Sequence, residues 1–287
     1  MPTLTSARPR PSPVLALALA FMAGGFLAAY WPVLTELVRQ WTGDDDYSHG
    51  LLIGPVVAYL VWKRSRDEGG FLPGGGGALG LALVLLCSTA ALVGILSGFR
   101  TLSNVACVVA VWGTAGFLFG AGALRRYGWE LFLLIFLVPI PSGLYAQITM
   151  PLQLLVTRSV AEILHVGGIP VLREGNILHL AQSTLQVVSA CSGLRSLITV
   201  TVLAYAFGLM TLTRPSGRLF LLGSSLPIAV LTNILRVLVL ALASQFSYTS
   251  VLEGTAHNVL GIVIFLANVG MLTLIAKGIS WVSPRRP

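Results

Sequence analysis

Charged residues are scarce in this chain of 287 residues. Only 10% of them are Asp, Glu, Lys or Arg, whereas 55% are hydrophobic and the mean hydropathy is +0.86. A soluble domain carries roughly 25% charged residues. This scarcity excludes a soluble protein and predicts an all-α integral membrane protein. The net charge of +8 then fits basic loops beside anionic lipid, and we expect no nucleic-acid partner.

Cysteine is scarce as well, and the three that are present lack the spacing of a metal site. Cys87, Cys107 and Cys191 form no Cys-x-x-Cys pair and have no accompanying histidine ligands. The sequence therefore indicates neither a zinc site nor a disulfide framework, and we expect no metal and no cofactor. Cys87 and Cys107 lie inside apolar runs, where a free cysteine behaves as a small hydrophobic residue.

Apolar runs divide the chain into membrane spans, because about 20 apolar residues cross a bilayer. We expect residues 1–287 to form a single polytopic domain with about eight transmembrane helices. The second run is the shortest, since the acidic run 44–46 precedes it and Lys63 ends it. The predicted spans are 13–31, 50–63, 78–97, 103–121, 128–146, 192–211, 218–242 and 257–276.

Basic residues gather on alternate loops, which predicts the orientation of the spans. With the N-terminus inside, 12 of the 18 Lys and Arg residues fall in inner segments and 4 in outer loops. Because Lys and Arg mark the cytoplasmic side, we predict a multi-pass protein of the cell inner (plasma) membrane with both termini in the cytoplasm. The glycine run 74–77 is then a flexible cytoplasmic linker. The inner basic residues are Arg8, Arg10, Lys63, Arg64, Arg66, Arg125, Arg126, Arg214, Arg218, Lys277, Arg285 and Arg286.

The longest outer segment, 147–190, is predicted to hold an interfacial helix and a small β-hairpin. From 148 to 164 the apolar residues fall on one side, as in a helix that lies in the membrane interface. Two short runs, 176–180 and 184–188, are separated by Ala-Gln-Ser and indicate the hairpin. The polar side of the helix is predicted to carry Gln153, Thr157, Arg158 and Glu162.

Cys191, Arg236 and His257 are ionisable residues in or beside these apolar spans. Such residues are costly to keep in a membrane and are therefore candidates for function. Cys191 and His257 each begin a span at its outer end. Arg236 lies 18 residues beyond Arg218, a rise of about 27 Å across a hydrocarbon core about 30 Å thick. All three side chains are thus predicted at the outer face.

The three residue types together predict acyl transfer through a thioester. The helix dipole and the charge of Arg195 would favour the thiolate of Cys191. The imidazole would move a proton between the thiol and a leaving amine. The guanidinium and the backbone N–H groups of Ser192 and Gly193 would stabilise the oxyanion. Taken singly, each of these residues also fits a structural role.

Two polar neighbours are candidates for supporting roles. Asn233 lies one turn before Arg236 and either orients it or forms a hydrogen bond to another helix. His49 either lines the outer mouth of the site or simply lies at the membrane interface. The acidic run 44–46 is most simply interpreted as a solvated helix start.

Four strings in this sequence resemble the exosortase/archaeosortase family. Three of them follow one another on the last three predicted spans, and the fourth lies in the N-terminal region. They are Ala-Cys-Ser-Gly-Leu-Arg-Ser-Leu (190–197), Leu-Thr-Asn-Ile-Leu-Arg-Val (231–237), His-Asn-Val-Leu-Gly (257–261) and Asp-Tyr-Ser-His-Gly (46–50). The resemblance implies a polytopic cysteine transpeptidase with Cys191 as nucleophile, assisted by Arg236 and His257.

The same resemblance implies a class of substrates. They would be secreted proteins with a C-terminal sorting signal, made of a PEP-like tripeptide, a transmembrane helix and a basic tail. Cleavage would leave a thioester on the extracytoplasmic face, and water or an amine would accept the acyl group. The residues alone leave open a transporter or a non-catalytic subunit of a polysaccharide or protein export system, since Pro139 and Pro141 interrupt the fifth predicted span.

Overall fold

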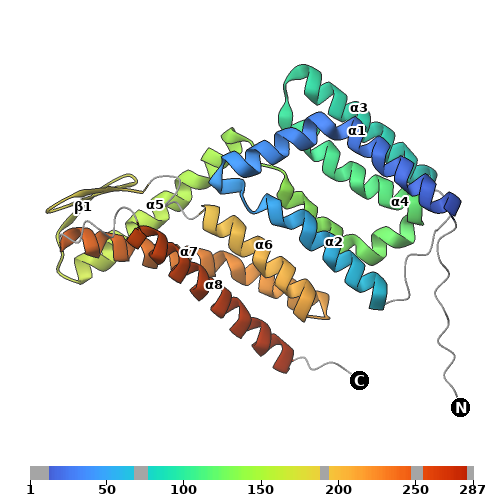
Figure 1. Ribbon diagram of the computed structural model, residues 1–287. Coiled ribbons are helices and arrows are strands. Elements are labelled where there is room, and N and C mark those ends of the chain that lie inside the picture. Colours follow the sequence, from blue (N-terminus) through green and yellow to red (C-terminus); the bar gives the residue numbers. More distant parts are fainter. Residues whose placement is uncertain (1–12, 68–76, 188–193, 247–254, 283–287) are drawn as a thin grey trace, which may run out of the picture.

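The computed structural model describes residues 13–67, 77–187, 194–246 and 255–282 (Figure 1). The predicted glycine linker falls outside the described residues except for Gly77. The first half contains α1 (Pro13–Gly43), η1 (Asp45–Tyr47), α2 (Gly50–Asp67), α3 (Ala78–Ser97), α4 (Arg100–Phe132) and η2 (Leu133–Leu137), where η marks a short 3-10 helix. The second half contains α5 (Ser142–Val166), β1 (Val171–Glu174), β2 (Ile177–Leu180), β3 (Thr184–Gln186), α6 (Leu194–Thr211), α7 (Pro215–Gln245) and α8 (Thr255–Val282).

Six helical stretches in the described part of the chain are long and apolar enough to cross a membrane, in agreement with an all-α membrane protein. Large apolar side chains point outward on them, such as Leu79 at 86% exposure and Leu96 at 79%. The predicted count of eight spans is not confirmed, because α2, which covers the predicted span 50–63, is not among the six. The six are Ala20–Gly43, Ala78–Ser97, Arg100–Leu137, Leu194–Thr211, Pro215–Gln245 and Val259–Trp281.

The fourth predicted span and the first part of the fifth lie in one helical stretch that bends sharply at Gly120. This residue has φ 75° and ψ 175°, a backbone conformation that is essentially restricted to glycine. The indole N–H of Trp112 donates to the carbonyl of Leu131, 3.1 Å away, so the two limbs run back along each other. In a straight helix these residues would be about 28 Å apart. Because η2 ends at Leu137, the predicted span end at 146 is wrong.

α1 packs against α3 and α4 through a cluster that includes two of the cysteines. Val33 and Leu37 are buried with Cys87, Cys107 and neighbouring alanines. This packing extends α1 beyond the predicted end at 31. Cys87 and Cys107 are free thiols at 5% and 4% exposure, as expected of small buried hydrophobic residues.

A second cluster joins the two halves of the chain. Side chains of α2, α4, η2 and α6 meet around Tyr205, whose hydroxyl donates to the carbonyl of Trp129 at 2.8 Å. Near the end of α2, Arg64 donates to both carboxylate oxygens of Glu130, at 2.9 and 3.2 Å. Glu130 is buried, and a buried carboxylate needs such a partner. These contacts hold α6 beside α2 (Figure 1).

The three strands form a small antiparallel sheet in the order β1-β2-β3. β2 and β3 coincide with the two strand runs predicted from the sequence, whereas β1 is an additional strand. The sheet packs on α5 and on the second half of α7, so it lies at one end of the bundle (Figure 1). The buried residues of this cluster are Val156, Val160, Ala161, Leu164, Val171, Leu178, Leu180, Val187, Val237 and Ala241.

α5 turns part of its predicted polar side toward the protein, so the predicted division of its two faces is wrong at Gln153, Thr157 and Leu155. Gln153 and Thr157 are buried. Asn176 donates to Oε1 of Gln153 at 3.2 Å, and Thr157 donates to the carbonyl of Gly175 at 3.1 Å. Leu155, from the predicted apolar side, is instead 48% exposed. The sheet supplies hydrogen-bond partners for polar side chains, so this side is stable against it.

Candidate active site

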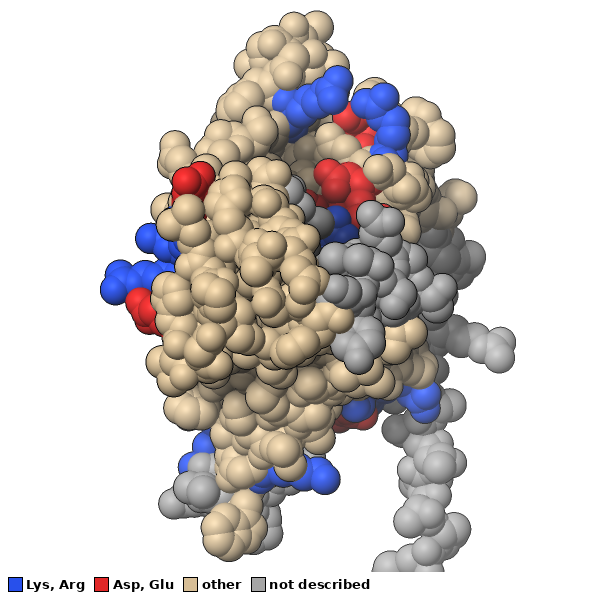
Figure 2. Space-filling view, turned by 90° about the vertical axis from the view of Figure 1, so that its left-hand side faces the viewer, with Lys and Arg blue, Asp and Glu red and all other residues tan. Residues whose placement is uncertain are grey.

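One end of the bundle carries the sheet and is called the sheet end here. It is formed by the start of α6, the end of α7, the start of α8 and segment 44–49 between α1 and α2. Figure 2 views the molecule from this side and shows acidic and basic side chains close together in a hollow of a largely uncharged surface. The ion pair between Arg195 and Asp46 belongs to this end, and Arg100 pairs with Glu36 where α4 begins beside α1.

The predicted nucleophile, Cys191, and its neighbours Ser192 and Gly193 lie outside the described residues. The structure describes the chain up to residue 187 and again from residue 194. Val187 is buried and donates a backbone hydrogen bond to the chain just before β2. Leu194, the first residue of α6, is also buried. The chain therefore leaves the sheet and enters α6 at the sheet end.

Segment 44–49 is tied to the chain between η2 and α5. The hydroxyl of Tyr47 donates to the carbonyl of Ile140 at 3.2 Å. The carboxylate of Asp44 accepts the backbone N–H of Asp46 at 2.9 Å and caps η1. The segment is thus fixed both by its own turn and by a contact distant in sequence, so the side chain of Asp46 projects from an ordered base.

Asp46 connects three segments that are far apart in the sequence. Its Oδ1 accepts a hydrogen bond from Nε of Arg195 at 2.5 Å, and its Oδ2 accepts one from the Tyr145 hydroxyl at 2.6 Å. Arg195 also lies 3.7 Å from the carboxylate of Asp45, whose side chain is 87% exposed, against 15% for Asp46. Burial and the adjacent carboxylate raise the pKa of the Tyr145 hydroxyl, so it is a protonated donor at neutral pH.

These carboxylates balance the charge of Arg195, which changes its predicted role. A guanidinium in contact with Asp46 adds little net positive field around it, because the opposite charges largely cancel. The expectation that Arg195 favours the thiolate of Cys191 therefore loses its main support. What the contacts show is that Arg195 ties the start of α6 to segment 44–49.

His49 lies in the turn between η1 and α2 and is half-buried. Burial lowers the pKa of its imidazole, and hydrogen bonds with the backbone of Phe136 and Asp46 oppose this shift in part. The ring is therefore neutral at pH 7. These contacts place His49 in the packing between segment 44–49 and η2, next to the residue that holds Arg195.

α6 and α7 are antiparallel neighbours, and a contact between them fixes the level of Arg236. The hydroxyls of Thr201 and Ser225 are 3.1 Å apart. Counting from this pair at 1.5 Å per residue, Arg236 lies about 6 Å beyond the level of Leu194, where α6 begins. Arg236 is therefore at the sheet end, as the sequence predicts for a residue near the end of a span.

α7 and α8 are also antiparallel, and a buried polar pair joins them. Thr232 donates to Oδ1 of Asn268 at 2.9 Å, and both residues are buried. The backbone of His257 belongs to the first turn of α8. Counting along both helices from the polar pair places it about 10 Å beyond the level of Arg236. Arg236 and His257 are thus at the same end of adjacent helices.

Arg236 lies in a part of α7 that is mostly covered by protein, and the sheet packs on the other side of this helix. Asn233 is 2% exposed and Arg236 is half-buried. Val237, the next residue, belongs to the buried cluster under the sheet. Further along, the hydroxyl of Ser183 in the β2–β3 turn is hydrogen-bonded to that of Ser244 near the end of α7. The surroundings of Arg236 are therefore largely protein, in which a charge interacts more strongly than in water.

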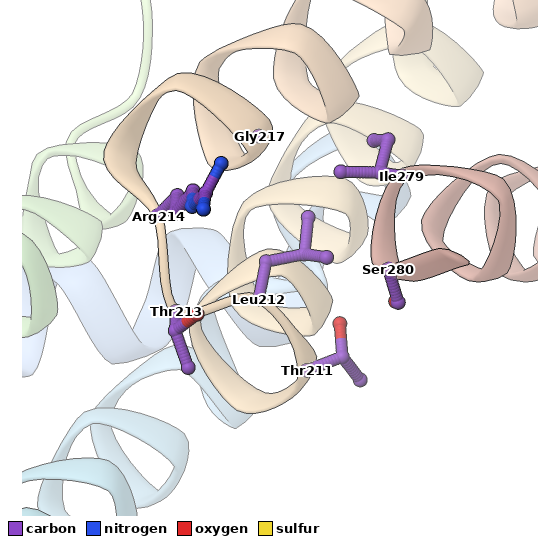
Figure 3. Close-up of a pocket in the computed structure, with 7 residues that line it drawn as sticks. All are labelled: Thr211, Leu212, Thr213, Arg214, Gly217, Ile279 and Ser280. Carbon is purple, nitrogen blue, oxygen red and sulfur yellow. The ribbon is translucent and has the colours of Figure 1, made fainter. Parts of the chain in front are cut away.

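A small pocket lies at the opposite end of the bundle, where α6 ends and α7 begins (Figure 3). Its volume is about 50 Å³. The length of α6, about 27 Å, separates it from the start of that helix, so it is distinct from the sheet end. It is lined by Thr211, Leu212, Thr213, Arg214, Gly217, Ile279 and Ser280.

Among the described residues, no group of three His, Cys, Asp or Glu side chains forms a metal ligand set.

Two residues of the sheet end were missed by the sequence-based prediction. The acidic run 44–46 was interpreted as a solvated helix start, which holds for Asp45 but not for Asp46. Tyr145 was not singled out at all. The available signal was the string Asp-Tyr-Ser-His-Gly (46–50), because it begins with Asp46.

The sequence matches one known family of membrane proteins. A sequence profile described as transmembrane exosortase matches residues 41–274. The match begins just before segment 44–49, ends within α8 and includes Cys191, Arg236 and His257. No curated protein and no solved structure matches the chain. Since the profile covers most of the sequence, this chain belongs to the transmembrane exosortase family.

Proposed function

We propose that this chain is a membrane cysteine peptidase and transpeptidase that removes a C-terminal sorting signal from secreted proteins. Membership of the exosortase family suggests protein sorting. The observation that carries the proposal is the convergence of three helix ends. α6, α7 and α8 contact one another, and Arg236, His257 and the start of α6, which Cys191 precedes, are at the same end of these helices.

In the proposed reaction, the thiolate of Cys191 attacks the carbonyl carbon of the scissile peptide bond. Arg236 and the N–H groups of Ser192 and Gly193 stabilise the oxyanion of the tetrahedral intermediate. His257 takes the thiol proton and gives it to the leaving amine as the C–N bond breaks. The product is a thioester between the sulfur and the new C-terminus. Water or an amine then attacks this thioester, loses its proton to His257 and releases the thiol.

We place the sheet end on the extracytoplasmic, periplasmic face of the inner membrane, with both termini in the cytoplasm. Basic residues gather at the opposite end, where Arg64 and Arg66 end α2, Arg214 precedes α7 and Lys277 lies near the end of α8. Lys and Arg mark the cytoplasmic side of membrane proteins. Secreted proteins would then reach the thiol after translocation.

The sheet offers a way to hold the sorting signal. β3 is an edge strand in the order β1-β2-β3, and the chain leads from it directly to Cys191. An extended peptide can pair with such an edge. A PEP-like tripeptide favours an extended conformation, because proline restricts the residue before it. The apolar span of the substrate would lie beside the bundle in lipid, with its basic tail in the cytoplasm.

The test is the processing of a reporter protein that ends in a PEP-like tripeptide, an apolar span and an arginine tail. Co-expression with the full chain is expected to shorten the reporter by the span and the tail, as read by intact mass. Reporters with a varied tripeptide define the motif, and one without any tripeptide should stay uncleaved. If every reporter keeps its full mass while the chain is folded in the membrane, the proposed function fails. A transporter would give that result together with solute flux in liposomes.

A further inference from the structure

We infer that Asp46 is a positioning residue that acts through Arg195. Its carboxylate, held by Tyr145, clamps the first turn of α6 and so fixes where the chain carrying Cys191 meets the rest of the site. The inference rests on the proposed function and extends it. Asp46 is not proposed to touch substrate or the reacting atoms.

Each oxygen of the Asp46 carboxylate has its own partner. Oδ1 accepts from Nε of Arg195 at 2.5 Å and Oδ2 from the hydroxyl of Tyr145 at 2.6 Å. Hydrogen bonds to an ionised carboxylate are among the strongest in proteins. With 15% of its side chain exposed, Asp46 is also less screened by solvent than Asp45, which is 87% exposed and 3.7 Å from Arg195. The structure therefore assigns the clamp to Asp46 rather than to the acidic run as a whole.

The clamp joins elements that the chain itself does not hold together. Asp46 is 149 residues from Arg195 and 99 from Tyr145. It lies in η1, whereas Tyr145 is in the first turn of α5 and Arg195 is the second residue of α6. One carboxylate thus fixes the relative position of three helix starts at the sheet end.

The base of the clamp is itself fixed. Trp41, at the end of α1, donates through its indole N–H to the carbonyl of Leu137 at 3.1 Å. Tyr47, next to Asp46, donates to the carbonyl of Ile140 at 3.2 Å. Segment 44–49 is therefore held by contacts that do not involve α6. A displacement of α6 would lengthen the ion pair between Arg195 and Asp46.

The position of Arg195 limits the position of the Cys191 thiol, because the two residues are close in the sequence. Cys191 precedes Arg195 by one helical turn in sequence, and a chain of that length spans at most about 14 Å. A misplacement of about 1 Å can cost a reaction about 100-fold. Loss of the clamp is therefore expected to lower the rate of the chemical step more than it weakens substrate binding.

The experiment compares Asp46→Asn with Asp45→Asn in the full-length protein, using cleavage of the reporter described above. Asp46→Asn is expected to lower kcat about 10- to 100-fold while KM changes less than about threefold. Asp45→Asn, which removes the neighbouring exposed carboxylate, is expected to keep wild-type values. Asp46→Glu retains the charge and should recover part of the lost kcat.

A double-mutant cycle tests whether the effect passes through Arg195. Arg195→Gln and the double variant Asp46→Asn/Arg195→Gln are expected to show the same loss as Asp46→Asn alone, because one interaction is removed in all three. Losses that multiply in the double variant, or a wild-type kcat for Asp46→Asn, would overturn the inference.

Tyr145→Phe provides a second test if Asp46→Asn does not accumulate in folded form. This variant removes a single hydroxyl and must still lower kcat several-fold. An unchanged kcat again overturns the inference. The proposed function is judged separately, since it fails if Cys191→Ala cleaves the reporter.

Discussion

Replacing Cys191 with alanine is expected to abolish release of the sorting signal, with a loss of at least about 1000-fold in the cleavage rate. The proposed reaction has no covalent path without the sulfur, and the remaining groups contribute only binding and oxyanion stabilisation. Cys191→Ser should also be nearly inactive, because a hydroxyl is far less acidic than a thiol. Gel mobility and intact mass of the reporter measure both variants.

The other two cysteines provide matched controls. Cys87 and Cys107 are buried where α1, α3 and α4 pack together, on helices that do not form the sheet end. Cys87→Ala and Cys107→Ala are therefore expected to cleave the reporter at rates near that of the wild type. Normal cleavage by both Cys191→Ala and Cys191→Ser would contradict the assignment of the nucleophile.

Replacing Arg236 with glutamine is expected to lower kcat about 100- to 1000-fold with a smaller change in KM. Removal of one oxyanion donor typically costs this much. The effect should be large here because Arg236 is half-buried and Asn233, one turn before it on α7, is buried. The measurement is the initial rate of reporter cleavage by detergent-purified protein across a range of reporter concentrations.

Arg236→Lys separates charge from geometry. Lysine keeps the positive charge but not the planar fork of N–H donors, so it should recover only part of the lost rate. Arg158→Gln is the control for removing an arginine, because Arg158 is 71% exposed on α5 and paired with Glu162. A wild-type kcat for Arg236→Gln in folded protein would remove Arg236 from the mechanism.

Much of the bundle could be predicted from local features of the sequence. Apolar runs predict the helices because each run must satisfy its backbone hydrogen bonds internally in lipid. The bend at Gly120 could not be predicted, since it depends on the contact between Trp112 and Leu131 across the two limbs. The side of α5 that faces inward likewise depends on the sheet. Thr157 bonds to the backbone carbonyl of Gly175, and Gln153 accepts a hydrogen bond from Asn176.

In the candidate site, too, some residues could be predicted from the sequence and others could not. Cys191, Arg236 and His257 stand out because ionisable residues are rare in apolar runs, and their place near helix ends follows from counting residues. The clamp of Asp46, Arg195 and Tyr145 is not predicted by a local pattern, because the string 46–50 points to Asp46 but not to its two partners. Its members are separated by 149 and 99 residues along the chain. A carboxylate in an acidic run is expected to be solvated unless the fold supplies it with partners, as it does for Asp46.

The most direct test of the central claim is to trap the thioester on Cys191. The full-length protein is mixed with the reporter, quenched in acid within the first turnover, digested and analysed by mass spectrometry. The account predicts a peptide in which Cys191 carries the new C-terminus of the reporter through a bond that hydroxylamine cleaves. A cleaved reporter with the acyl group on another residue, or with no adduct on Cys191 at any time during the first turnover, would contradict it.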